Sequence, residues 1–299
     1  MRVADWGTSF IAFSLYVNRA TNNPVIDTRN FGSITMSTLK LPQRINGVLL
    51  DITGVLKDGS SAIPGSVEAV NRLKKAGLAI KLLTNETQVT RSSLCLTLSK
   101  MGYCVTEHDI IPPCPALVDL LRKEKLRPHL LVHPDVLSEF DGLNKEDPNC
   151  VVVGDAAENF SYENLNKAFR ILIDMDKPRL FSMGRGKYYR EKGDLVLDVG
   201  VFTTALEYAT GVSAEVVGKP LASFFHSALS AIGVKPEEAV MVGDDIESDI
   251  GGAQACGIAG ILVRTGKFRP CDEKHPRVKP DVIVDDLAEA VDIIVQSRN

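Results

Sequence analysis

The sequence contains few of the residues that mark metal-binding, disulfide-rich or membrane proteins. Its 299 residues include six cysteines without a C-x-x-C pair, and five histidines without the spacing of zinc ligands. No apolar run approaches the roughly 18 residues that span a bilayer. These absences argue against a structural zinc site, a disulfide framework and a membrane-spanning helix. The scattered cysteines are typical of reduced, mostly buried thiols in an intracellular protein.

An excess of positive charge is also missing. Lys and Arg total 34 against 38 Asp and Glu, which gives a net charge of −4. We therefore expect no nucleic-acid partner and no membrane partner, because binding to either polyanionic surface would need a basic field. The chain is 44% hydrophobic and 24% charged, which is typical of a globular protein and excludes wholesale disorder.

Two common nucleotide-binding motifs are absent. Gly218–Lys219 precedes Pro220 and has no glycine five residues before it, so this segment is not a P-loop. No G-x-G-x-x-G follows the first apolar strand, which makes a dinucleotide site a weak hypothesis.

The first 43 residues differ in composition from the rest. We expect residues 1–43 to form a disordered N-terminal extension. The alternative is that translation starts at Met36. The uncharged stretch 7–18 has the length of a signal-peptide core, but Asp5 and the lack of a small-x-small cleavage site argue against secretion.

From residue 44 onward, short apolar runs alternate with segments of helical spacing. This alternation predicts an α/β fold, with a doubly wound, Rossmann-like parallel sheet as its core. Three prolines in residues 111–115 indicate a hinge, and a second α/β pattern follows. We expect a core of residues 44–116 and 212–299, interrupted by an inserted cap domain of residues 117–211. The expected strands are 47–50, 78–83, 214–217, 239–242 and 258–263 in the core, and 130–132, 151–153 and 180–183 in the cap.

Polar residues follow several core strands directly. The strand tips carry Asp51 with Thr53, then Thr84 with Asn85, then Lys219, and finally the trio Asp244, Asp245 and Asp249. Ligands of open parallel sheets bind at this edge, so we expect these side chains to converge. Carboxylates with a lysine and hydroxyl and amide donors suit magnesium and phosphate, and an aspartate in line with phosphorus can act as a nucleophile.

Each residue also has a simpler interpretation. Asp51 could form an Asx turn, Thr84–Asn85 a helix cap, Gly243–Asp245 a turn, and Lys219 a solvated side chain. Four such sites in order, each at a strand tip, are much harder to attribute to chance.

These motifs resemble those of the haloacid dehalogenase superfamily of phosphatases, in which a large α/β cap can lie between the second and third motifs. Six segments, cap included, are further similar to one family of that superfamily, whose members hydrolyse phospholysine, phosphohistidine and inorganic pyrophosphate. This likeness covers about residue 45 to the C-terminus and rests on 49–56, 84–86, 147–152, 205–209, 215–220 and 264–270.

The resemblance implies a role for each motif residue. It implies Asp51 as nucleophile and magnesium ligand, and the carbonyl of Thr53 and the carboxylate of Asp244 as further Mg²⁺ ligands. Thr53 and Lys219 are implied, with Asp51, as catalytic residues. Asp245 and Asp249 would be a further ligand or would orient Lys219 and the metal's water. The implied phosphate contacts are Asp51, Ile52, Thr53, Thr84, Asn85 and Lys219. The family also implies a homodimer, located in the cytoplasm and possibly the nucleus.

One position departs from the wider superfamily. Most of its phosphatases carry a second aspartate two residues after the nucleophile as general acid and base, where this chain has Thr53. A threonine cannot shuttle protons near pH 7, so P–N and P–O–P bonds, whose leaving groups need less help, should be preferred over sugar monoesters. Two other functions stay open: a capped phosphatase of a small phosphorylated metabolite, and a catalytically slow phosphate-binding scaffold.

Two cation-rich segments outside the motifs have uncertain roles. Residues 184–190 of the cap could contact a second phosphate or an imidazole, or form a solvated hairpin with its tyrosines packed beneath. Residues 264–279 follow a core strand, and we expect an exposed loop there rather than a polyanion site.

Overall fold

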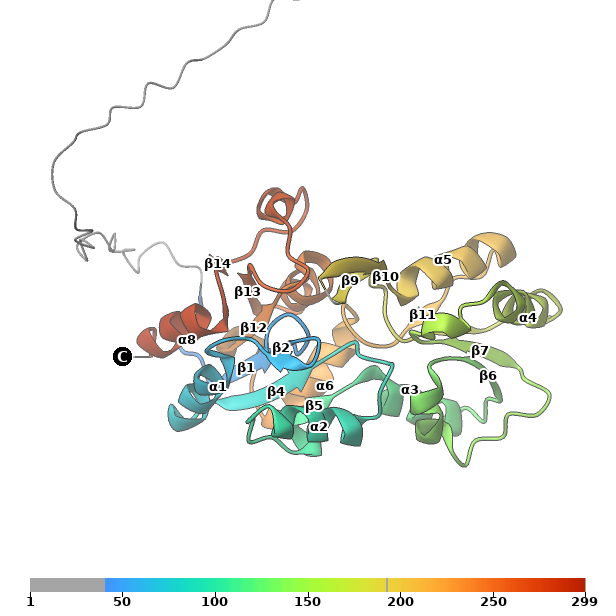
Figure 1. The fold of residues 1–299 in the computed structure, drawn as a ribbon, viewed down its shortest axis with the longest axis horizontal. Coiled ribbons are helices and arrows are strands. Elements are labelled where there is room, and N and C mark those ends of the chain that lie inside the picture. The colour runs from blue at the N-terminus through green and yellow to red at the C-terminus, as the bar shows by residue number, and fades with distance from the viewer. Residues whose placement is uncertain (1–40, 192, 299) are drawn as a thin grey trace, which may run out of the picture. The chain divides into compact units, whose positions relative to one another are not determined.

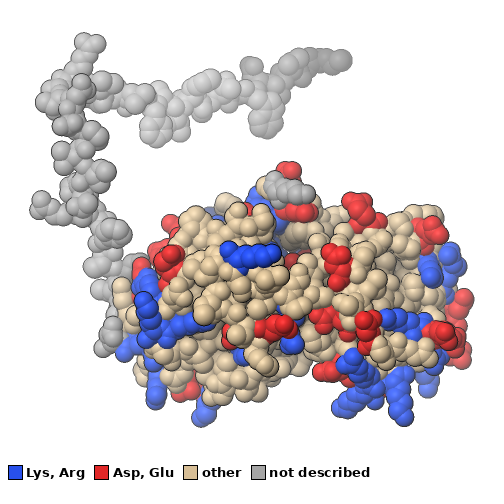
Figure 2. All heavy atoms as spheres, turned by 60° about the horizontal axis from the view of Figure 1, so that its bottom comes forward, with Lys and Arg blue, Asp and Glu red and all other residues tan. Residues whose placement is uncertain are grey.

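The computed structural model describes residues 41–191 and 193–298, which belong to one compact unit. The expectations for the N-terminal extension therefore lie almost entirely outside the described residues. Leu41, at the start of the described chain, already packs against the main hydrophobic core. Among the described residues, no helix combines the length and apolar character that crossing a bilayer requires. Side chains of both charges are spread over the face shown in Figure 2.

A six-stranded parallel sheet forms the larger half of the fold (Figure 1), as the alternating pattern predicts. Val48 and Leu50 of its first strand face one hydrophobic cluster, whereas Leu49 faces another, because successive strand residues point to opposite sides. Burial on both sides explains why this first strand is wholly apolar. In spatial order the strands are β14 (Val282–Val284), β13 (Ala259–Val263), β12 (Ala239–Gly243), β1 (Gly47–Leu50), β4 (Ala79–Leu83) and β5 (Ile110–Ile111).

Helices cover both faces of this sheet. The amphipathic helices α1 (Ser66–Lys75) and α8 (Leu287–Gln296) contact each other and pack on one face, together with α2 (Arg91–Lys100). Helices α6 (Ala222–Ile232) and α7 (Gly252–Ala255) pack on the other face. The sheet is therefore doubly wound.

A second, four-stranded parallel sheet takes three of its strands from the segment expected to form the cap (green through yellow to orange in Figure 1). One of its faces carries α3 (Pro113–Lys123), and the other carries α4 (Tyr162–Ile173) and α5 (Val199–Thr210). A hairpin of β9 (Tyr188–Glu191) and β10 (Asp194–Leu197) precedes α5. The strand order is β11 (Glu215–Val216), β8 (Leu180–Ser182), β7 (Cys150–Val153) and β6 (Pro128–Leu131).

Two details correct the expected organisation. The predicted core strand 214–217 is instead β11, which pairs with β8 at the edge of the smaller sheet. The proline-rich segment is not only a hinge, because Pro113 starts α3, where its missing N–H costs no helical hydrogen bond. Cys114 packs in the hydrophobic cluster on one face of the smaller sheet, and Val212 and Ala214 pack in the cluster on the other face. The domain boundaries themselves stay a prediction.

Several short elements complete the fold. The hairpin of β2 (Lys57–Asp58) and β3 (Ser61–Ala62), which was not predicted, follows β1, and a π-helix spans Ile246–Gly251. These pieces are too short to show a periodic pattern. The 3₁₀ helices span Glu107–Asp109, Pro134–Phe140, Ala157–Asn159, Pro236–Glu238 and Pro270–Lys274.

Candidate active site

A cavity of about 210 Å³ lies where β1, β4 and β12 end. Asp51, Thr84 and Asp244, each the first residue after one of these strands, line it from the core. Residues after β7 and around the β9–β10 hairpin, including Asp155 and Asp198, line it from the smaller sheet's segment. The strand tips therefore converge as the parallel topology requires.

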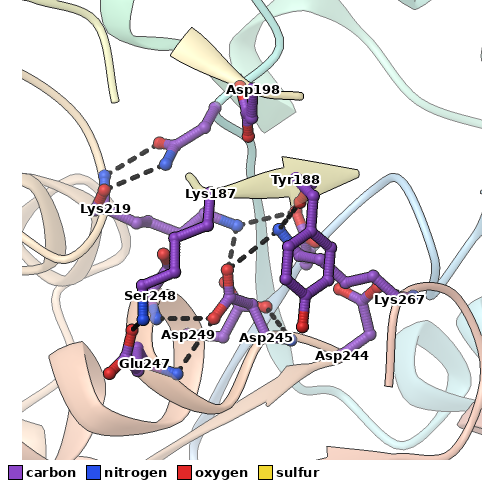
Figure 3. A network of polar contacts seen from close by, with 12 residues as sticks. Lys187, Tyr188, Asp198, Lys219, Asp244, Asp245, Glu247, Ser248, Asp249 and Lys267 are labelled. Carbon is purple, nitrogen blue, oxygen red and sulfur yellow. Dashed lines mark hydrogen bonds and ion pairs between the residues drawn. The ribbon is translucent and has the colours of Figure 1, made fainter. Parts of the chain in front are cut away.

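Lys219 lies between two carboxylates at the base of this cavity (Figure 3). Its Nζ lies 2.7 Å from Asp51 Oδ1 and 2.7 Å from Asp249 Oδ1, and it also donates to the carbonyl of Leu83 at 3.1 Å. The lysine is only 2% exposed. Burial lowers the pKa of Lys219, but the two carboxylates outweigh burial and raise it above its ordinary value, so the ammonium stays charged.

Asn85 fixes the backbone of Lys219. The Asn85 side chain donates from Nδ2 to the Lys219 carbonyl at 2.9 Å and accepts from the Lys219 N–H at 2.9 Å. A side chain on Gly218, whose φ is +119°, would come within 2.7 Å of Asn85 Oδ1. The Asn85 side chain therefore positions Lys219, and because Asn85 also lines the cavity, the expected phosphate contact stays a prediction.

We expect Asn85→Ala to lower kcat/KM about 10- to 100-fold, because the ammonium of Lys219 would lose its fixed position. Loss of the two hydrogen bonds should also reduce the free energy of unfolding by about 1–3 kcal/mol. Steady-state kinetics and thermal unfolding measure the two effects. Asn164→Ala, which removes a hydrogen bond on α4, is the control. Unchanged kinetics in Asn85→Ala would show that Lys219 needs no such support.

Asp244 is held by the loop after β13. Its Oδ2 accepts the N–H of Lys267 at 2.8 Å. Gly54 and Gly266, both at positive φ, approach so closely that a Cβ on either would lie 2.2 Å or 2.0 Å from that oxygen. Only glycine fits such an approach.

Asp245, another of the expected site residues, contacts both the π-helix and Lys267. Asp245 caps the π-helix by accepting the N–H groups of Glu247 and Ser248, both at 2.9 Å, and its Oδ2 lies 2.9 Å from Lys267 Nζ. Burial raises the pKa of Asp245, but Lys267 and the Ser248 N–H outweigh burial and hold it below its usual range.

The first two motifs contribute further residues. Thr53 lines the cavity and is partly buried, whereas the side chain of Ile52 is fully buried in the core, which leaves only its main chain for phosphate. Thr84 is 2% exposed, and its hydroxyl accepts the N–H of Glu86 at 3.0 Å. The helix-cap interpretation of Thr84–Asn85 is wrong, because the next helix, α2, begins at Arg91 and is capped by Thr90.

Three carboxylates form a cluster suited to a divalent cation. Asp51, Asp244 and Asp249 each offer one oxygen, and these atoms lie within 4.8 Å of one another. Oδ1 of Asp244 is buried and has no hydrogen-bond partner among the described residues. Burial and then Asp51 raise the pKa of Asp244 well above its ordinary value, which indicates a shortage of positive charge. An oxygen-only donor set is what a hard divalent cation prefers.

Sequence reasoning missed Lys267, which lies in the cavity wall beside Asp245. Arg190, which belongs to the expected substrate-contact segment 184–190, lines the cavity as well, and its guanidinium reaches the same loop as Lys267. The expectation of an exposed loop at 264–279 is therefore wrong for residues 265–267. A signal did exist, because Thr265–Gly266–Lys267 follows a buried strand in the same way as the other motifs do. The many cations of residues 264–279 led instead to the expectation of an exposed loop.

Comparisons with known proteins agree with this geometry. A family model described as haloacid dehalogenase-like hydrolase matches residues 48–146, and a second, described as HAD-hydrolase-like, matches residues 216–290. The phospholysine phosphohistidine inorganic pyrophosphate phosphatase of Xenopus laevis is 54% identical, covering 85% of this chain and 96% of its own. The protein of the same name from Homo sapiens is 54% identical, covering 84% and 95% respectively.

A solved structure supports the fold independently. The 4-nitrophenylphosphatase of Thermotoga maritima matches with a TM-score of 0.76 at 26% identity, covering 84% of this chain and 98% of its own. Its name, like those of the relatives, is that of a phosphatase, and its match extends over both sheets. The chain is therefore a phosphatase of the haloacid dehalogenase-like hydrolases and belongs to the phospholysine phosphohistidine inorganic pyrophosphate phosphatase family.

Proposed function

We propose that this phosphatase is a Mg²⁺-dependent phosphohydrolase that works through an aspartyl-phosphate on Asp51. The observation that carries the proposal is the buried Lys219, whose Nζ lies 2.7 Å from Asp51 beside a cluster of three carboxylates. The strand end directs Asp51 into the cavity, and the lysine offsets charge there. Such an arrangement suits nucleophilic attack on phosphorus.

The cation would be held by Asp51, Asp244 and the main-chain carbonyl of Thr53. The buried, unpaired Oδ1 of Asp244 supports this assignment among the described residues. When bound, magnesium would offset negative charge on the phosphoryl oxygens and on the carboxylates. Asp249, in ion-pair contact with Lys219, would orient the lysine, while Asp245 would fix the chain beside Asp244.

The reaction would proceed in two steps. First, a carboxylate oxygen of Asp51 bonds to phosphorus while the P–N or P–O bond breaks, and the leaving group keeps the electron pair. A basic leaving nitrogen then takes a proton from solvent. In the second step a water oxygen bonds to phosphorus, the bond to Asp51 breaks, and phosphate leaves with the proton balance made up by solvent. Lys219 offsets the negative charge of the reacting oxygens in both steps.

We propose phospholysine, phosphohistidine and inorganic pyrophosphate as substrates. The names of the relatives support this, and so does Thr53, which lines the cavity where a proton-shuttling aspartate would otherwise lie. Without that carboxylic acid, turnover should depend on leaving groups that need little protonation by the enzyme.

Thr53→Asp tests the substrate argument. General acid–base catalysis is worth about 10²–10⁴-fold, so the variant should raise sugar-monoester turnover relative to pyrophosphate turnover by about 10-fold or more. Thr53→Asn is the matched control, because it has similar size but cannot transfer the proton. An unchanged ratio in Thr53→Asp would count against this explanation of specificity.

A substrate panel decides between the functional alternatives. Phosphate release from pyrophosphate, phospholysine, a phosphohistidine peptide and sugar phosphates is measured with magnesium and with EDTA. Activity confined to sugar phosphates would favour a metabolite phosphatase, and no release from any compound would favour a phosphate-binding scaffold.

From family membership we also propose that the protein forms a homodimer and that it is located in the cytoplasm and the nucleus. Sedimentation of the purified chain and imaging of the tagged protein test them. A monomer, or an exclusively extracellular location, would contradict them.

A further inference from the structure

The loop Thr265–Lys267 links the metal carboxylate to the rest of the site. Its Lys267 N–H donates to Asp244 Oδ2 at 2.8 Å, and the Thr265 hydroxyl donates to the carbonyl of Gly54. Gly266, at φ +61°, lies so close that its Cβ would come within 2.0 Å of Asp244 Oδ2 and 2.5 Å of Gly54 Cα. The 265–267 loop therefore covers one oxygen of Asp244 with main chain.

The opposite side of this loop is held from the β9–β10 hairpin. Arg190 of β9 donates from Nε to the carbonyl of Gly266 at 2.9 Å and from Nη1 to the carbonyl of Gly193 at 2.8 Å. Lys267 Nζ adds a longer contact, 3.5 Å, to the carbonyl of Tyr188, beside its ion pair with Asp245 (Figure 3). The guanidinium of Arg190 thus bridges the hairpin and the loop.

The consequence concerns which oxygen of Asp244 is available. Because the loop occupies Oδ2, Oδ1 is the oxygen left without a hydrogen-bond partner among the described residues, and it is buried. If the loop moved and the hydrogen bond from the Lys267 N–H were lost, Oδ2 of Asp244 would be free and the carboxylate could rotate. Residues that orient a metal ligand in this way usually influence affinity for the ion.

We propose that Arg190 is a positioning residue for the metal site, acting on Asp244 through the main chain of Gly266 and Lys267. The inference rests on the proposed function. It assigns to Arg190 of β9 a role in completing the cation site. Contact of the β9–β10 hairpin with the 265–267 loop and correct orientation of Asp244 would then occur together.

A neighbouring contact provides a matched control. Lys187 of the same cap segment forms an ion pair with Glu247 of the core at 2.6 Å, but its side chain is 70% exposed and no contact of it with the 265–267 loop is found among the described residues. Exposed pairs contribute little, so Lys187→Gln removes a cation and a hairpin–core contact without touching the loop.

The test compares Arg190→Gln, Arg190→Lys and Lys187→Gln in the full chain. Magnesium binding is measured without substrate, by calorimetry and by the rise of the melting temperature on adding the ion. We expect Arg190→Gln to weaken magnesium binding about 10-fold, and Arg190→Lys to recover part of it through one donor. Lys187→Gln should stay within about 2-fold of the parent.

Kinetics separate this role from direct substrate contact. In Arg190→Gln the magnesium concentration for half-maximal turnover should rise about 10-fold, while substrate KM at saturating magnesium changes much less. Gly266→Ala, which disturbs the loop from its other side, should produce the same pattern. Melting in EDTA shows whether each variant is folded.

Two outcomes overturn the inference alone. These are unchanged magnesium binding in Arg190→Gln, or a raised substrate KM with unchanged magnesium response, which would place the guanidinium on the substrate. If the parent protein itself neither binds magnesium nor needs it for turnover, the proposed function fails instead.

Discussion

Replacing Asp51 by Asn lowers pyrophosphate turnover by at least about 10³-fold, because loss of a nucleophile removes the covalent route. The folded state should survive this change. Lys219 keeps its ion pair with Asp249 at 2.7 Å, and loss of the charge on Asp51 relieves repulsion that raises the pKa of Asp244. Phosphate release under saturating magnesium and melting in EDTA measure the two effects.

The control for this variant is Asp292→Asn. Asp292 lies on α8 in an exposed ion pair with Arg72. Its replacement by asparagine should therefore change neither the activity nor the melting temperature appreciably. Residual activity of Asp51→Asn within 10-fold of the parent would remove Asp51 from the nucleophile role. A misfolded Asp51→Asn protein would contradict the electrostatic argument instead.

Replacing Lys219 by Met has the second largest expected effect. Its ammonium is the positive charge in contact with both Asp51 and Asp249, and it is 2% exposed. Removing one partner of a buried ion pair costs about 3–5 kcal/mol of stability. Loss of a charge-stabilising donor costs about 10²–10³-fold in kcat. Both losses should appear, the first as a lowered melting temperature in EDTA.

Magnesium distinguishes this explanation from simple loss of packing. In Lys219→Met, Asp51 and Asp249 lose the ammonium that lies between them. Added magnesium should therefore raise the melting temperature of this variant more than that of the parent. Lys100→Met, at an exposed position, serves as the control. An unchanged melting temperature of Lys219→Met in EDTA would show that the buried carboxylates do not depend on Lys219.

Much of the core could be predicted because its determinants are local. The run Gly47–Leu50 is apolar throughout, as a strand buried on both faces must be, and it ends at Asp51, where the chain reaches the ligand-binding edge. The same logic correctly places Thr84 and Asp244 in one cavity. Parallel topology alone brings these strand ends together.

Other predictions failed because identical local patterns can serve either sheet. The segment 214–217 has the local pattern of a short strand, yet its residues Glu215–Val216 pair with β8 in the smaller sheet. Lys219 consequently enters the site from a crossover segment, where Asn85 rather than a core strand fixes its main chain. Which strand pairs with which is a long-range choice, and a strand of two residues does not encode it.

The sequence by itself determined the doubly wound sheet and the strand-end carboxylates, because both follow from local periodicity and from the direction of parallel strands. Only the tertiary structure decided that Asn85 holds Lys219, that the 265–267 loop covers Asp244, and that Arg190 reaches that loop from β9. These contacts join main-chain atoms of segments far apart in the chain. Main-chain donors and acceptors are the same at every residue except proline, so the order of side chains does not reveal such partners.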